Sequence, residues 1–198
     1  MHLRTFPPAV LAAVLSACAT EPVLLNSERI EHRFGSYGIE VLASEAGLRR
    51  SSLYSLEHDA AICRTYAVVR FADQLDDRYQ EEHTKVLAGN SIGAVFRSHG
   101  WDVHKQTMYI GNLALPAQST SIGELMHIWG PRELAMHVYQ LLLVRNEQVF
   151  EYATIVETHH PDYLSESDLH ELYEFDEMTA LSSKTVSNLV ALVLRDEK

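Results

Sequence analysis

Residues 157–162 combine two carboxylates with two histidines, side chains that can bind a metal or move a proton. The β-branched run before them predicts that they end a strand. Because side chains alternate along a strand, Glu157 and His159 are expected on one face, and Pro161 keeps His160 extended. A carboxylate and an imidazole could therefore meet a metal ion side by side.

A metal site at this strand end needs more ligands than the segment itself supplies. A catalytic zinc has about three protein ligands and an open fourth position, so His137 or His170 would have to be added by the fold. Histidines beside a proline at a strand end more often lie at the surface or bond to backbone. We therefore expect no metal at Glu157, His159 and His160, and no cofactor elsewhere.

A Gly-x-Ser-x-Gly pattern spans residues 89–93, with Ser91 at its centre. It resembles the nucleophile elbow of the α/β-hydrolases, where a serine lies on a tight turn between a strand and a helix. The resemblance implies Ser91 as the nucleophile of a hydrolase. Its acid and base would come from side chains such as Asp162 with His159 or His170, and spacing does not choose among them.

The surroundings of Ser91 favour a structural role for the two glycines. The carboxyl half predicts an antiparallel hairpin, whereas the hydrolase fold needs βα repeats around a parallel sheet. In an unbroken helix, Gly89 and Gly93 would each be less favourable than alanine by up to about 1 kcal/mol. Either the chain bends here or this face packs closely against another element, and we expect Ser91 not to be a nucleophile.

Cys63 lies in an alternating segment, residues 62–71, that predicts a strand. Alternation places Arg64 and Arg70 on one face and Cys63 on the other, apolar face. No base or cation lies near the thiol on that face, so we expect a buried, unreactive cysteine. The residues expected on the apolar face are Cys63, Thr65, Ala67, Val69 and Phe71.

An acidic run near the carboxyl end predicts either a solvated helix face or a docking surface for a cationic partner. It lacks the Asp/Asn-rich loop and central glycine of an EF-hand, so calcium binding of that type is not expected. The run consists of Glu166, Asp168, Glu171, Glu174, Asp176 and Glu177.

The amino terminus reads as a secretory signal. Arg4 precedes an apolar run over residues 6–15, and small residues then lead to Cys18. The run would span roughly 15 Å as a helix, too short to cross a membrane. The sequence Leu-Ser-Ala-Cys ending at Cys18 resembles the lipobox of bacterial lipoproteins.

This resemblance implies that residues 1–17 are removed, that Cys18 becomes the first residue, and that lipid is attached to its thiol and usually to its amine. Two or three acyl chains anchor a protein durably to a membrane. Ala19 follows, instead of the aspartate that commonly retains such proteins at the inner membrane. We therefore expect an outer-membrane lipoprotein facing the periplasm.

Charge limits the partners of the mature protein. Removal of residues 1–17 takes away Arg4, leaving a formal charge of −12 on 181 residues. A strongly acidic surface repels phosphates, so nucleic acid is not an expected partner. The expected partners are the membrane, through the lipid anchor, and an envelope protein.

Hydrophobic periodicity predicts one α+β domain with a mostly antiparallel sheet, a central helix and carboxyl-terminal helices. It would occupy residues 27–198, after a lipidated tether at 18–26. The expected strands are 37–42, 48–56, 62–71, 101–113, 134–144 and 149–158. The expected helices are 27–34, 80–98, 165–177 and 186–194. The sequence favours a binding, accessory or assembly factor of the cell envelope, with an envelope hydrolase using Ser91 or a metal near His159 and His160 as the alternative.

Overall fold

The computed structural model describes residues 24–45, 47–118, 120–175 and 180–195. The predicted signal peptide, Cys18 and most of the predicted tether lie outside the described residues, as do Asp176 and Glu177 of the acidic run. Among the helices that are described, none combines the length and apolar character needed to cross a bilayer.

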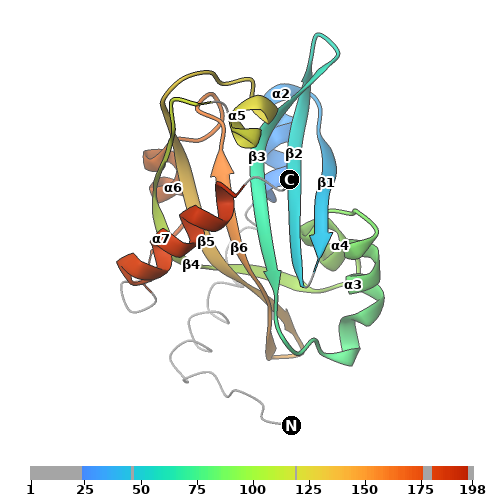
Figure 1. Cartoon of the computed structure of the whole chain (residues 1–198). Helices are drawn as coiled ribbons and strands as arrows, with labels where there is room; N and C mark the ends of the chain where they lie inside the picture. The colour runs from blue at the N-terminus through green and yellow to red at the C-terminus, as the bar shows by residue number, and fades with distance from the viewer. Residues whose placement is uncertain (1–23, 46, 119, 176–179, 196–198) are drawn as a thin grey trace.

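Six strands form one sheet in which every pair of neighbouring strands is antiparallel, which confirms the predicted α+β class (Figure 1). The order across the sheet is β1-β2-β3-β6-β5-β4, so β3 and β6 join two successive three-stranded units. The strands are β1 (Gly38–Glu45), β2 (Leu48–Glu57), β3 (Ala60–Phe71), β4 (Asp102–Leu115), β5 (Arg132–Arg145) and β6 (Gln148–His159).

The β5–β6 hairpin is the clearest success of the sequence pattern. Asn146 and Glu147 form its two-residue turn, and both have positive φ, as a type I′ turn requires. The long β-branched and aromatic runs on either side form the two strands. Their residues are buried on both faces, because helices cover both sides of the sheet.

The helices divide between the two faces of the sheet. Clusters of buried side chains place α2, α3, α4 and α6 on one face, which we call the inner face, and α5 and α7 on the other, the outer face. The helices are α2 (Asn26–Phe34), α3 (Gln80–Leu87), α4 (Ile92–Ser98), α5 (Ser121–Leu125), α6 (Glu166–Leu172) and α7 (Ser183–Val193), with a 3-10 turn, η1 (Asp77–Tyr79), before α3.

Several predicted boundaries are wrong for local reasons. The single helix expected over 80–98 is two helices, because Gly89 adopts φ +104°, which a helix does not allow, and the chain turns there. Helix α2 begins at Asn26, one residue before the expected start, and the Asn26 side chain is buried. Helix α6 opens at the expected Ser165 cap but ends at Leu172, earlier than predicted.

Cys63 is buried as predicted, but on the opposite face from the one expected. The register of β2 against β3 shifts between Leu53 and Tyr54, so that Arg64 is an extra residue in β3 and the alternation changes phase. Cys63 consequently packs with Tyr66 in the outer cluster. Burial raises the pKa of the thiol to about 12, which makes it a poor nucleophile.

Candidate functional site

A pocket opens on the inner face, between the sheet and the start of helices α2 and α4. Its cavity volume is about 80 Å³, and the space is partly open to solvent. Most of the lining is apolar and comes from both halves of the sheet. The apolar lining includes Leu25, Ile39, Val69, Val103, Leu141 and Ile155.

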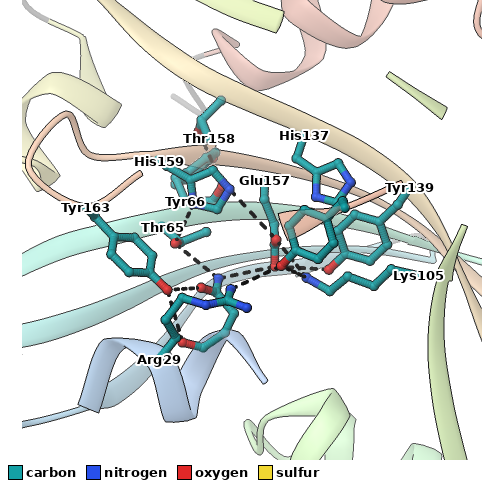
Figure 2. A network of polar contacts seen from close by, with 12 residues as sticks. Arg29, Thr65, Tyr66, Lys105, His137, Tyr139, Glu157, Thr158, His159 and Tyr163 are labelled. Carbon is teal, nitrogen blue, oxygen red and sulfur yellow. Dashed lines mark hydrogen bonds and ion pairs between the residues drawn. The ribbon is translucent and has the colours of Figure 1, made fainter. Parts of the chain in front are cut away.

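Three polar side chains on neighbouring strands line this pocket and contact one another: Lys105, Tyr139 and Glu157 (Figure 2). We call this group the floor of the pocket. The Lys105 Nζ atom lies 3.1 Å from Glu157 Oε2, and the Tyr139 hydroxyl donates to Glu157 Oε1 over 3.0 Å. The ammonium also lies 4.2 Å from the centre of the Tyr139 ring, a cation–π contact. Glu157 is thus held from two sides in a buried position.

The electrostatics of this group are those of a stable ion pair. Burial by itself raises the pKa of Glu157, but the charge and hydrogen bond of Lys105 act together with His159 and His137 and lower that pKa to about 2. Burial lowers the pKa of Lys105, yet Glu157 and Tyr139 raise it well above its ordinary value. Burial raises the pKa of Tyr139. At neutral pH the site therefore holds a carboxylate, an ammonium and a neutral phenol.

A second set of hydrogen bonds extends from Glu157 toward α2 (Figure 2). The Asn26 amide donates to Thr65 Oγ1 over 3.1 Å and to Glu157 Oε1 over 3.4 Å. Thr65 is also bonded to His159 Nδ1 at 3.0 Å, and Tyr163 donates to Asn26 Oδ1 at 2.5 Å. This network fixes the start of α2 over the sheet and so defines one wall of the pocket.

His137 lies beside this network and is also kept neutral. Its Nε2 atom bonds with Thr107 Oγ1 at 3.2 Å, and its ring stacks on Tyr173 with centroids 4.4 Å apart. Burial lowers the pKa of His137 to about 2 and that of His159 to about 4. Neither imidazole is charged at neutral pH.

The expected surface or backbone-bonded position of His159 is wrong, whereas the shared face of Glu157 and His159 is confirmed. Both point into the interior, because β6 is a central strand covered on both sides, and Glu157 Oε2 lies 4.0 Å from His159 Nε2. His160 bonds to backbone instead: it contacts the Met126 carbonyl oxygen at 3.1 Å and accepts from the Asp162 amide. It does not join the other two.

The other residues considered as metal ligands do not complete a site. His137 reaches the network but bonds to Thr107, and His170 is exposed on α6. Within the described ranges, no group of three or more His, Cys, Asp and Glu side chains is arranged to hold a metal ion.

Ser91 lies at the rim of the same pocket, but not in an elbow. Helix α3 precedes the Gly-x-Ser-x-Gly pattern where the hydrolase turn has a strand, and Ser91 is the residue before α4. Gly93 packs against Leu25, since a Cβ at that position would lie 2.6 Å from a Leu25 methyl group. The two explanations considered for the glycines both hold: the chain bends at Gly89 and packs closely at Gly93.

The side chains proposed as acid and base for Ser91 are engaged elsewhere. His159 is bonded to Thr65, Asp162 lies 3.9 Å from His160, and His170 is exposed. Among the residues that the structure describes, no hydrogen bond joins any of the three to Ser91.

Sequence reasoning missed Lys105, Tyr139 and Arg49, all of which line the pocket. Lys105 carried a signal, because it is in phase with Val103 on the apolar face of its predicted strand. No such signal marked Arg49, because the predicted strand that contains it has polar residues on both faces.

Comparison with known proteins adds no further constraint. No protein-family model matches the chain, and no curated protein matches it either.

Proposed function

We propose that this chain is a lipid-anchored protein of the bacterial envelope whose domain binds a small amphipathic molecule in the inner-face pocket. The observation that carries the proposal is an apolar pocket ending on the fixed pair of Lys105 and Glu157 with Tyr139. Apolar walls with a few convergent polar groups are the usual composition of a ligand site. The walls would bind the apolar body and the floor would orient a polar group.

The chemistry of the floor supports binding more than catalysis. A general acid or base works best when its pKa lies near the operating pH. The pKa of Glu157 is lowered and that of Lys105 is raised, so both groups stay charged through the neutral range. The hydrolase alternative has less support, because Ser91 stands between two helices and its proposed partners are engaged elsewhere.

The envelope location rests on the amino-terminal sequence. The lipobox ending at Cys18 supports a lipid anchor, and Ala19 supports outer-membrane sorting. Cys18→Ser should leave an uncleaved precursor, because the lipoprotein peptidase acts only on the modified cysteine. Normal cleavage of that variant to a soluble product would contradict the anchor while leaving the pocket untouched.

Calorimetric titration with octan-1-ol and octanoate tests ligand binding. The wild-type domain should bind at least one of these probes with a saturable isotherm, and Val103→Trp, which places an indole in the pocket, should abolish it. The matched control is Gln106→Trp, on the opposite face of the same edge strand, which should leave the isotherm unchanged. Absence of binding by the wild type, or equal binding by Val103→Trp, would contradict the proposal.

A further inference from the structure

We propose that the ligand of this pocket carries a carboxylate, and that Arg49 binds it. The inference rests on the proposed ligand-binding function and names the chemical class of the ligand. The observation behind it is that the Arg49 guanidinium is buried and that one of its nitrogen atoms has no hydrogen-bond partner among the described residues.

Arg49 lies on β2 with 1% of its surface exposed, and it lines the pocket. Its Nε atom donates to Ser51 Oγ at 3.0 Å, and its Nη1 atom donates to the carbonyl oxygens of Val86 and Asn90 at 2.8 and 3.1 Å. The Nη2 atom is buried and has no hydrogen-bond partner among the described residues. Three of the five guanidinium N–H groups are therefore used, and two remain.

The partners that Arg49 does have are neutral. A hydroxyl and two carbonyl groups orient the guanidinium without cancelling its charge, and within the described part of the chain no carboxylate forms an ion pair with it. Lys105 differs, because Glu157 neutralises it at 3.1 Å. The charged groups that line the pocket are thus two cations and one anion, and the unbalanced charge is that of Arg49.

This excess positive charge inside an acidic protein favours an anionic ligand. A buried cation without a counter-ion is unfavourable, and a ligand carboxylate would remove that penalty while accepting a hydrogen bond from Nη2. Two hydroxyls lie within reach of the same region, because Ser51 and Ser91 also line the pocket. Ser51 accepts from Arg49 and so keeps its own O–H available to donate.

The simpler alternative is that Arg49 only secures the end of α3. Its bonds to the Val86 and Asn90 carbonyl groups place a cation at a helix C-terminus, where cations are stabilising. That role accounts for the Nη1 contacts but not for the buried, unpartnered Nη2 atom. The two roles differ in one measurable respect, since only the proposed one makes ligand affinity depend on ligand charge.

The test compares octanoate, octan-1-ol and octylammonium by calorimetry at neutral pH. The wild type should bind octanoate about tenfold or more tightly than octan-1-ol, because a charge-assisted hydrogen bond from Nη2 to a carboxylate is roughly twice as strong as one to a neutral hydroxyl, and it should bind octylammonium most weakly. Arg49→Gln should lose the preference for octanoate but still bind octan-1-ol, which shows that its pocket is intact. Arg49→Lys, which keeps the charge, should retain part of the preference.

Arg50 provides the matched control. It is a neighbouring buried arginine on the same strand, and it bonds to Tyr66 and to the Leu192 carbonyl group on the outer side of the sheet. Arg50→Gln should leave the preference for octanoate unchanged. Equal affinity for octanoate and octan-1-ol in the wild type, or an unchanged preference in Arg49→Gln, would overturn this inference and leave the proposed pocket standing. Failure of all three probes would overturn both.

Discussion

Replacing Lys105 by methionine tests whether the floor of the pocket is a true ion pair. Methionine keeps most of the apolar length of lysine and removes the charge, so Glu157 loses its cation while it stays buried. With the charged atoms 3.1 Å apart, the lost attraction is about 5 kcal/mol at an effective dielectric constant of about 20. Removing one partner of a buried pair typically costs about 3–5 kcal/mol. We therefore expect the free energy of unfolding to fall by about that amount.

Urea unfolding of the wild type, Lys105→Met, Glu157→Gln and the double variant gives the coupling between the two side chains. The double variant should be more stable, by about 2 kcal/mol or more, than the sum of the single losses predicts, because it leaves no unpaired charge. In Lys105→Met the pKa of Glu157 should rise above its ordinary 4.5. A raised folded-state pKa gives stability at low pH that is lost as pH rises, so the loss should be larger near about pH 8 than near about pH 5. A loss below about 1 kcal/mol at both pH values would refute the ion pair.

Three further predictions concern other parts of the inner and outer faces. Burial lowers the folded-state pKa of His159 from 6.5 to about 4. His159 should therefore contribute at most about 3 kcal/mol to the loss of stability as pH drops through that window, and a pH series on His159→Gln should show a correspondingly smaller loss. The buried thiol of Cys63 should resist a maleimide until urea unfolds the domain, and rapid native labelling would show that its burial is wrong. Gly93→Val should lower the melting temperature through its clash with Leu25, whereas Ser91→Ala should change it little; the reverse order would contradict the packing.

Elements with strong local signals could be predicted from the sequence. The β5–β6 strands follow from two long β-branched runs around a short turn. The Ser165 cap follows from the spacing of Ser165 and Asp168, and in the structure the Asp168 amide donates to the Ser165 hydroxyl. The bulge at Arg64 could not be predicted, because nothing in the alternation of that strand marks where one residue is extra.

The candidate site could be predicted only in part. The shared face of Glu157 and His159 follows from alternation along one strand. Their burial does not, because it depends on β6 lying between β3 and β5, which is a property of the sheet order. The pairing of Glu157 with Lys105 joins residues 52 positions apart in the chain, and local patterns contain no information on such a contact.

The most direct test of ligand binding in the pocket is a methyl NMR titration of the labelled domain with octanoate. Ile155 and Val156 are neighbours on β6 that face opposite sides of the sheet, and Val69 and Val68 form a similar pair on β3. The proposal predicts saturable shift changes at Ile155 and Val69, with little change at Val156 and Val68. Changes centred on Val156 and Val68, or no saturable change at Ile155 and Val69, would contradict it.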